Sequence, residues 1–273
     1  MLKHRVITAL VLLAGLLAAV FLLSQPLWLA LIGLVCAAAA WEWGGLCRWS
    51  SAGKAVFSAV CASACLAIGL LTGLDGSGAR PLLALPYGAA ALFWLLLVPL
   101  WLRQHWTLRS HAAAVGIGLL VLVPCALAMA HLRMLDPWAL LGAMALVWIA
   151  DIAAYFTGRA FGRHKLAPAI SPGKTWEGAG GALAGVLVFG VGVALFVGSR
   201  GVSTIPLPLL MVVLAVLTAI SIEGDLFESL LKRQAGIKDS GRILPGHGGI
   251  LDRIDSLTST LPVVGLIALW PLF

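Results

Sequence analysis

The dominant pattern of this chain is a series of long apolar runs separated by short polar segments. A helix needs about 20 apolar residues to cross a hydrocarbon core of about 30 Å. The runs are continuous rather than alternating, which favours helices over barrel strands, because a helix satisfies its own backbone hydrogen bonds in lipid. The pattern predicts nine spans, at residues 6–23, 27–43, 55–73, 81–102, 112–130, 137–158, 178–198, 205–222 and 257–272. The expected fold is an all-α, polytopic transmembrane helical bundle.

Composition and the placement of charge support a membrane protein and predict its orientation. Hydrophobic residues make up 61% of the chain and charged residues 11%, far outside the range of soluble globular domains. If the N-terminus is cytoplasmic, fifteen of the 18 Lys and Arg residues fall in cytoplasmic segments. The other three are Arg80, Arg133 and Arg200. This bias predicts a cytoplasmic N-terminus.

The net charge of +7 therefore lies mostly on the cytoplasmic face of the predicted bundle. A basic face of this kind favours anionic lipid headgroups or a polyphosphate ligand. The segments outside the membrane carry neither a long basic tail nor basic residues interleaved with aromatics, so we expect no nucleic-acid partner.

Acidic residues are distributed unevenly along the chain. Of 11 acidic residues, only Glu42, Asp75 and Asp136 precede position 150. We treat residues 1–273 as a single integral membrane domain. In it, residues 1–137 are expected to be mainly scaffold spans, and residues 138–273 the catalytic half.

Asp151 is the first candidate site residue. It lies inside an apolar run, residues 147–156, where a charge is costly unless it faces a polar cavity or a partner. A structural ion pair with Arg159 is the alternative to a role in a site.

The cytoplasmic segment 171–178, which reads SPGKTWEG, resembles part of a phosphate-binding loop. That motif needs a glycine at position 168, where this chain has Pro168, so a Walker-type nucleotide site is excluded. Lys174, with the hydroxyls of Ser171 and Thr175, is still suited to contact phosphate oxygens at the start of a helix. Thr175 is equally suited to be a plain helix N-cap.

A second group of polar residues follows the eighth predicted span. If that helix continues, Asp225, Glu228, Ser229 and Lys232 have the spacing i, i+3, i+4, i+7 and share one face. Two acids and a cation then point to the same place.

Asp252 and Asp255 form another acidic pair at i, i+3, with Arg253 between them pointing elsewhere. Carboxylates from separate segments suit Mg²⁺, a hard cation that binds a few carboxylates together with water and substrate phosphates. The pattern predicts a Mg²⁺ site formed by four residues: Asp225, Glu228, Asp252 and Asp255.

The segment between these acidic pairs, residues 245–249, places three glycines around His247. Glycines let the backbone approach a ligand closely, and their N–H groups can form an anion-binding nest. We expect His247, Gly248 and Gly249 to bind substrate. The alternative is a solvated, salt-bridged loop whose glycines only make turns.

Three segments together, residues 229–233, 238–241 and 244–255, resemble the signature of the phosphatidate cytidylyltransferase (CDP-diacylglycerol synthase) family. The resemblance implies a polytopic enzyme that makes CDP-diacylglycerol and pyrophosphate from CTP and phosphatidate. It further implies Mg²⁺ dependence, K⁺ as a second cation, a homodimer and a site open to the cytosol. The family's metal-binding aspartates match Asp225 and Asp252. We expect a bacterial inner (plasma) membrane as the location.

The remaining roles follow from the need to neutralise phosphate charge, which lysines and arginines do directly and aspartates do by holding Mg²⁺. Catalytic roles are expected for Asp225, Asp252, Lys232, Asp255 and Lys238. Substrate contacts are expected from Asp151, Ser171, Lys174, Thr175, Ser229, Arg233, His247, Gly248, Gly249 and Arg253.

Three other functions are alternatives. A CDP-alcohol phosphatidyltransferase needs an acidic pattern after Asp75 that this chain lacks, because no acid occurs between there and Asp136. An ion-coupled transporter would use Asp151 as its coupling carboxylate, with acids near the midplane of both halves. A CTP-dependent transferase acting on a polyisoprenoid lipid is the hardest to separate, since no short motif encodes a pocket for two acyl chains.

Overall fold

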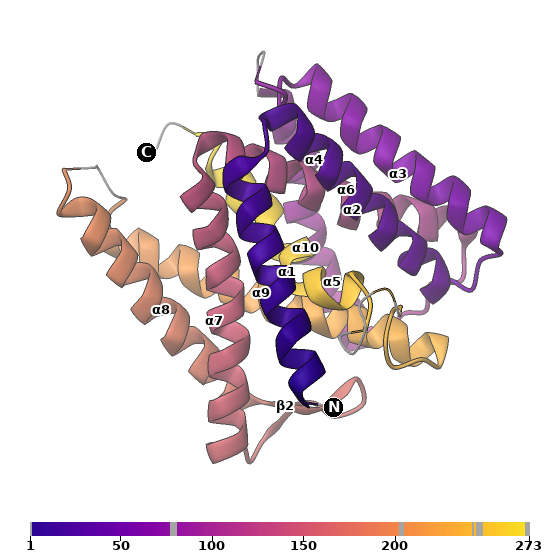
Figure 1. The fold of residues 1–273 in the computed structure, drawn as a ribbon. Coiled ribbons are helices and arrows are strands. Elements are labelled where there is room, and N and C mark those ends of the chain that lie inside the picture. The colour runs from indigo at the N-terminus through magenta and orange to yellow at the C-terminus, as the bar shows by residue number, and fades with distance from the viewer. Residues whose placement is uncertain (1, 77–80, 202–204, 242, 244–247, 271–273) are drawn as a thin grey trace.

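The computed structural model describes residues 2–76, 81–201, 205–241, 243 and 248–270, which fold into a bundle of packed helices (Figure 1). The helices are α1 (Leu2–Leu22), α2 (Gln25–Leu46), α3 (Ser51–Leu71), α4 (Ala84–Leu92), α5 (Val98–Gln104), α6 (His111–Leu135), α7 (Pro137–Phe161), α8 (Trp176–Gly198), α9 (Leu207–Ala235) and α10 (Leu251–Ile267). A π-turn at Phe93–Leu97 joins α4 to α5. Each apolar run predicted from the sequence contains a helix.

The helices confirm an all-α, polytopic membrane bundle. Seven helical segments among the described residues are long and apolar enough to cross a membrane. Leu10–Leu22 of α1 is also apolar, and α10 has 17 residues with two acids near its start. The total of nine spans and the cytoplasmic N-terminus stay predictions.

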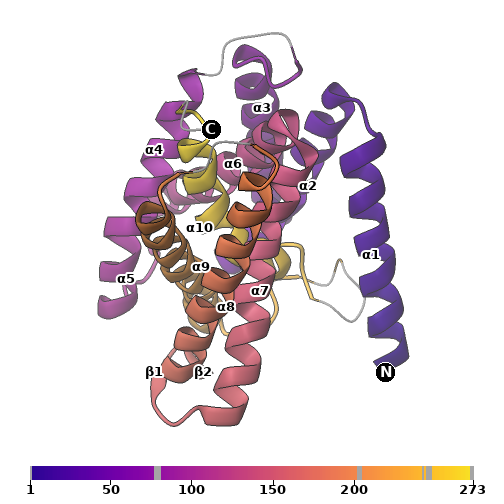
Figure 2. The ribbon, with the colours of Figure 1, turned by 90° about the vertical axis from the view of Figure 1, so that its left-hand side faces the viewer.

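Helix α10 lies in the interior of the bundle, where it packs against α9, α6, α4 and α7 (Figure 2). Its buried hydroxyls bond to carbonyl oxygens one turn back. Ser259 Oγ donates to the Ser256 carbonyl at 2.9 Å, and Thr260 Oγ1 donates to the same carbonyl at 2.8 Å. Small, internally satisfied side chains of this kind let neighbouring helices approach closely in a membrane.

The close approach of α9 to α10 occurs at Gly224. A Cβ atom built on Gly224 would lie 2.5 Å from Ser259 Oγ and 2.8 Å from the Asp255 carbonyl oxygen. Only glycine fits there without displacing α10. Because Asp225 follows Gly224 directly, this contact brings Asp225 beside the start of α10.

A two-stranded hairpin between α7 and α8 is a departure from the all-helical prediction. Strand β1 (Lys165–Ala167) pairs antiparallel with β2 (Ser171–Thr175), with Lys165 opposite Thr175. Pro168 lies in the connection between the strands, where no backbone N–H is needed. Figures 1 and 2 both place the hairpin toward the same end of the bundle as the start of α1.

The base of the hairpin is closed by contacts with the first turn of α8. Trp176 N–H donates to the His164 carbonyl at 2.9 Å. The Glu177 carboxylate accepts from the backbone N–H groups of Arg163 and His164 at 3.1 and 3.2 Å. These bonds tie the residues before β1 to the first turn of α8.

Candidate functional site

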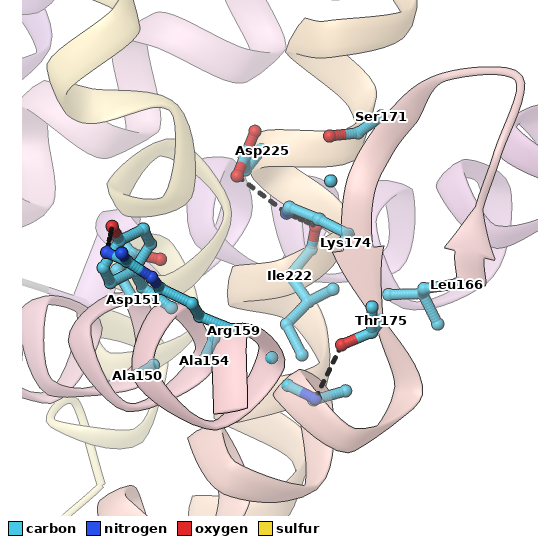
Figure 3. Close-up of a pocket in the computed structure, with 15 residues that line it drawn as sticks. Ala150, Asp151, Ala154, Arg159, Leu166, Ser171, Lys174, Thr175, Ile222 and Asp225 are labelled. Carbon is cyan, nitrogen blue, oxygen red and sulfur yellow. Dashed lines mark hydrogen bonds and ion pairs between the residues drawn. The ribbon is translucent and has the colours of Figure 1, made fainter. Parts of the chain in front are cut away.

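An ion pair between the hairpin and α9 lies at the centre of the candidate site. Lys174 Nζ is 2.7 Å from Asp225 Oδ2 (Figure 3). Lys174 Nζ also donates to the Ile222 carbonyl at 3.4 Å, and Ser229 Oγ donates to Asp225 Oδ1 at 3.1 Å. Both oxygens of Asp225 therefore have a partner, and the lysine predicted to bind phosphate is held by a predicted metal ligand.

A cavity of about 480 Å³ opens beside this pair, and it is called the polar cavity below because charged side chains lie on its otherwise largely apolar walls. Its walls come from α7, β2, the start of α8 and α9, and they include Asp151, Ser171, Lys174, Thr175 and Asp225. Asp151 thus shares a cavity with a lysine and another carboxylate. Arg159, the alternative ionic partner of Asp151, donates instead to the Tyr155 hydroxyl at 2.9 Å.

A second ionic cluster joins α9 to α10. Lys232 Nζ lies 2.7 Å from Glu228 Oε2 and 2.7 Å from Asp252 Oδ1. This arrangement confirms that α9 continues as a helix past the predicted span, since Glu228 and Lys232 meet one turn apart. The lysine is largely buried, with 13% of its side chain exposed, so it is a fixed cation rather than a mobile surface charge.

Asp252 is surrounded by donors. Its Oδ2 accepts from Ser240 N–H at 2.9 Å, from Ser240 Oγ at 2.9 Å and from Gly249 N–H at 2.8 Å. Burial raises the pKa of the Asp252 carboxyl, but the bonds from Lys232, Gly249 and Ser240 lower it by more. The net pKa lies below the ordinary value, so Asp252 is ionised at neutral pH.

Asp255 is within electrostatic reach of acids in both clusters. Its carboxylate is close enough to those of Asp225, Glu228 and Asp151 to be repelled by each of them. The structure therefore brings the predicted acids of α9 and α10 to one side of the bundle. However, Asp225 pairs with Lys174 and Asp252 pairs with Lys232, so the two aspartates do not bind the same lysine.

Carboxylate oxygens are the donor type that a hard divalent cation binds, but these carboxylates do not form a complete coordination sphere. Among the described residues, no three acidic, histidine or cysteine side chains are grouped as ligands of one ion. Glu228 Oε1 is buried without a hydrogen-bond partner in the described part of the chain, which leaves one oxygen open for an additional ligand. Asp252 has its acceptor sites occupied by protein donors.

Some of the residues predicted to contact substrate also have structural partners within the protein, and their substrate roles stay predictions. Thr175 is buried and caps α8, because its Oγ1 accepts from Gly178 N–H at 3.1 Å. Arg233 Nε donates to the Ile170 carbonyl at 3.3 Å and ties α9 to the hairpin. Lys238 and Arg253 are exposed.

The glycine-rich segment is only partly described. His247 lies outside the described residues. Gly248 has a φ of +81°, a left-handed conformation that favours glycine, and the N–H of Gly249 points at Asp252 rather than into open space. In this structure the N–H of Gly249 therefore binds the Asp252 carboxylate, and substrate binding by Gly248 and Gly249 stays a prediction.

Glu42 was assigned to the scaffold from the sequence, but it lies beside the site. This buried residue of α2 accepts hydrogen bonds from Ser240, Ile250 and Leu251, next to Asp252. The sequence did contain a signal for Glu42, since a lone acid in an apolar span is costly and has a partner or a function.

A family model and several known proteins match this chain. The model of the cytidylyltransferase family matches residues 3–270. The phosphatidate cytidylyltransferase of Pseudomonas aeruginosa is 44% identical over 276 residues, which cover 99% of this chain and 97% of the relative. That of Haemophilus influenzae is 35% identical over 298 residues, with 96% of each chain covered. That of Brucella suis biovar 1 is 50% identical over 122 residues, 45% of this chain and 43% of the relative.

Proposed function

The chain belongs to the cytidylyltransferase family, and from that membership we propose that its substrates react in the polar cavity beside Lys174 and Asp225. The activity is transfer of a cytidylyl group from CTP to phosphatidate, which gives CDP-diacylglycerol and pyrophosphate. An ion-coupled transporter and a CDP-alcohol phosphatidyltransferase are thereby set aside, as is a polyisoprenoid substrate.

The reaction needs positioning and charge neutralisation more than a protein nucleophile. A phosphate oxygen of phosphatidate attacks the α-phosphorus of CTP, and the bond from that phosphorus to the bridging oxygen of the β-phosphate breaks. The nucleophile is already anionic, so the barrier arises from bringing two anions together and stabilising the leaving pyrophosphate. Two lysines beside acidic side chains, Lys174 next to Asp225 and Lys232 next to Asp252, suit this task.

The observation that carries the proposal is the Lys174–Asp225 pair on the wall of the cavity. A phosphate oxygen that enters the cavity competes with Asp225 for the ammonium group of Lys174. Asp225 is released by the same exchange, and it then becomes available to a cation. The hairpin that carries Lys174 positions the phosphate, and Ser171 lies on the same wall.

We propose Mg²⁺ as the divalent ion, held by Asp225, Glu228 and Asp255 with Asp252 beside them. The support is the donor type of these residues and the unpartnered Oε1 of Glu228. When bound, the ion supplies positive charge to the triphosphate. K⁺ as a second cation rests on the family resemblance alone.

The lipid substrate fits the apolar cavity next to the polar one. This cavity, of about 960 Å³, is lined by α5, the hairpin, α8 and α9, and it shares Leu166, Ala179 and Ile222 with the polar cavity. We propose that an acyl chain of phosphatidate lies there, with its phosphate directed over the shared wall toward Lys174. Apolar pockets with a few polar groups are typical of such ligands.

The protein is a multi-pass membrane protein with bacterial relatives. We propose that it lies in the inner (plasma) membrane with the site on the cytoplasmic face. The support is the bias of basic residues and the position of the hairpin at the same end as the start of α1. A homodimer is proposed from the family resemblance.

A transfer assay with purified protein tests this function. The protein is incubated with phosphatidate, Mg²⁺ and each of the four ribonucleoside triphosphates, and liponucleotide is measured by mass spectrometry. We expect product from CTP and none from ATP, GTP or UTP. Equal product from all four nucleotides, or none from CTP, would contradict the proposal.

A further inference from the structure

Glu42 connects the N-terminal half of the chain to the segment that carries Asp252. It lies on α2 with 2% of its surface exposed. Its Oε1 accepts from Ile250 N–H at 3.1 Å, and its Oε2 accepts from Leu251 N–H at 2.8 Å. These N–H groups belong to the start of α10, where the helix has unsatisfied donors and favours a negative charge. A side chain from α2 thus performs the capping that the segment before α10 does not provide.

Two motif glycines fit closely around this carboxylate. A Cβ atom on Gly241 or on Gly249 would overlap the oxygens of Glu42. The backbone at Gly241 and at Gly249 therefore approaches Glu42 as closely as a glycine allows. A larger residue at either position would displace the Glu42 carboxylate, whether or not a ligand is bound.

Ser240 joins Glu42 to Asp252. Its Oγ lies 3.1 Å from Glu42 Oε2 and 2.9 Å from Asp252 Oδ2, and it accepts from Asp252 N–H at 3.3 Å. The single hydroxyl hydrogen of a serine can be donated to only one of the two carboxylates at a time. The orientation of Asp252 therefore depends on how Glu42 shares this hydroxyl. It also depends on how Glu42 holds the N–H groups of Ile250 and Leu251, which directly precede Asp252.

We propose that Glu42 is a positioning residue for cytidylyl transfer, which acts by holding Ser240, Ile250 and Leu251 so that Asp252 faces the reacting groups. It touches no substrate itself. The inference rests on the proposed function, because Asp252 matters for the rate only if the site acts as described. A purely structural Glu42 would instead stabilise the whole bundle without a special effect on this segment.

Amide hydrogen exchange, followed by mass spectrometry on the full-length protein in detergent, tests the local effect. In Glu42→Gln one carboxylate oxygen becomes an NH₂ group, which cannot accept from Ile250 or Leu251. We expect exchange in peptides covering residues 249–256 to become about tenfold faster. In parallel, kcat should fall about 10- to 100-fold, since a small misplacement of a catalytic group has this effect. KM for CTP should change much less than kcat.

Trp43→Phe is the matched control on the same helix. Trp43 is buried next to Glu42, and its Nε1 donates to the Ala114 carbonyl at 3.0 Å, so the variant also loses one buried hydrogen bond of α2. Among the described residues of the segment directly before α10, none is a hydrogen-bond partner of Trp43. We expect a lower unfolding temperature in this variant with wild-type exchange at residues 249–256 and wild-type kcat.

Two loop variants keep the proposal testable if Glu42→Gln does not fold. Ser240→Ala removes the shared hydroxyl, and Gly249→Ala pushes a methyl group against Glu42. Both should reduce kcat, and combining Ser240→Ala with Glu42→Gln should cost less than the sum of the two. Wild-type kcat in both loop variants, or unchanged local exchange in folded Glu42→Gln, overturns the proposal. Failure of the proposed function is distinct, because the wild type would then make no CDP-diacylglycerol while the exchange differences persist.

Discussion

Lys174 Nζ lies 2.7 Å from Asp225 Oδ2, and this pair is the direct ionic link between the β-hairpin and α9. The lysine is 24% exposed and the aspartate 30%, so both side chains remain accessible from the polar cavity. A partly exposed pair of this kind contributes little to stability. It can therefore be exchanged for a pair with substrate phosphate at small cost.

Replacing the lysine of this pair should reduce catalysis far more than stability. In Lys174→Met the cavity keeps its shape but loses its cation, and we expect kcat/KM for CTP to fall by about 100-fold or more. Steady-state kinetics with phosphatidate in mixed micelles measures the effect. Lys165→Met is the control, because Lys165 is an exposed cation of the opposite strand outside the cavity. Equal losses in the two variants would show that only the total charge of the hairpin matters.

The Asp252 carboxylate should be needed for transfer. Asp252→Asn keeps the size of the side chain but removes a charge from the cluster with Lys232 and Glu228. We expect cytidylyl transfer to fall by several orders of magnitude, about 10³-fold, while the protein still inserts and folds. Asp239→Asn, an exposed acid of the same segment, should keep its activity. Near-normal transfer by purified Asp252→Asn would reject the role of Asp252.

Removal of divalent cations should stop the reaction reversibly. The acids of α9 and α10 repel one another, and Glu228 Oε1 has no hydrogen-bond partner among the described residues. We expect a chelator to abolish transfer and excess Mg²⁺ to restore it, with CDP-diacylglycerol measured at each step. The unfolding temperature serves as control, since a loss of structure would also stop the reaction. Full activity in the chelator would contradict a divalent requirement.

The contact between α9 and α10 should tolerate no side chain at Gly224. Gly224→Ala places a methyl group against Ser259 and the Asp255 carbonyl, and overpacking of this kind destabilises by about 1–3 kcal/mol. A lower unfolding temperature in detergent, measured by intrinsic tryptophan fluorescence, checks this. Gly192→Ala in α8 is the control, because a Cβ there meets nothing within 4 Å. If both alanine variants unfold at the wild-type temperature, α10 is free to shift.

Helices and the membrane setting could be predicted from sequence, because apolar runs of sufficient length have one satisfactory structure in lipid. The continuation of α9 beyond residue 222 was a condition of the sequence analysis, under which Asp225, Glu228 and Lys232 share one face, and the helix does continue, to Ala235. The hairpin could not be predicted, since residues 165–175 are short, rich in proline and without alternation.

The pairings of side chains within the site were harder to predict from the sequence than the residues that form it. Nearly all the acids and lysines of the site were identified, but not that Lys174 binds Asp225 while Lys232 binds Asp252. Glu42 contacts Ser240 and Leu251 across 198 and 209 residues of sequence. No local pattern encodes contacts at that separation, because helix packing alone brings them together.

The apolar cavity between the hairpin and α9 should determine how tightly the lipid substrate binds. Ala219 of α9 lines this cavity, and Ala219→Phe fills part of it with a ring. We expect KM for long-chain phosphatidate to rise about tenfold, because an acyl chain then competes with the ring for the same space. KM for CTP should stay unchanged, since Ala219 is absent from the walls of the polar cavity.

Val216→Phe is the control, because Val216 is exposed on the same helix and does not line the apolar cavity. Assays with phosphatidates of increasing chain length extend the test: a chain that lies in the cavity gives a difference between the two variants that grows with length. An equal rise in KM for both variants would show that the acyl chain binds elsewhere on the surface of the bundle.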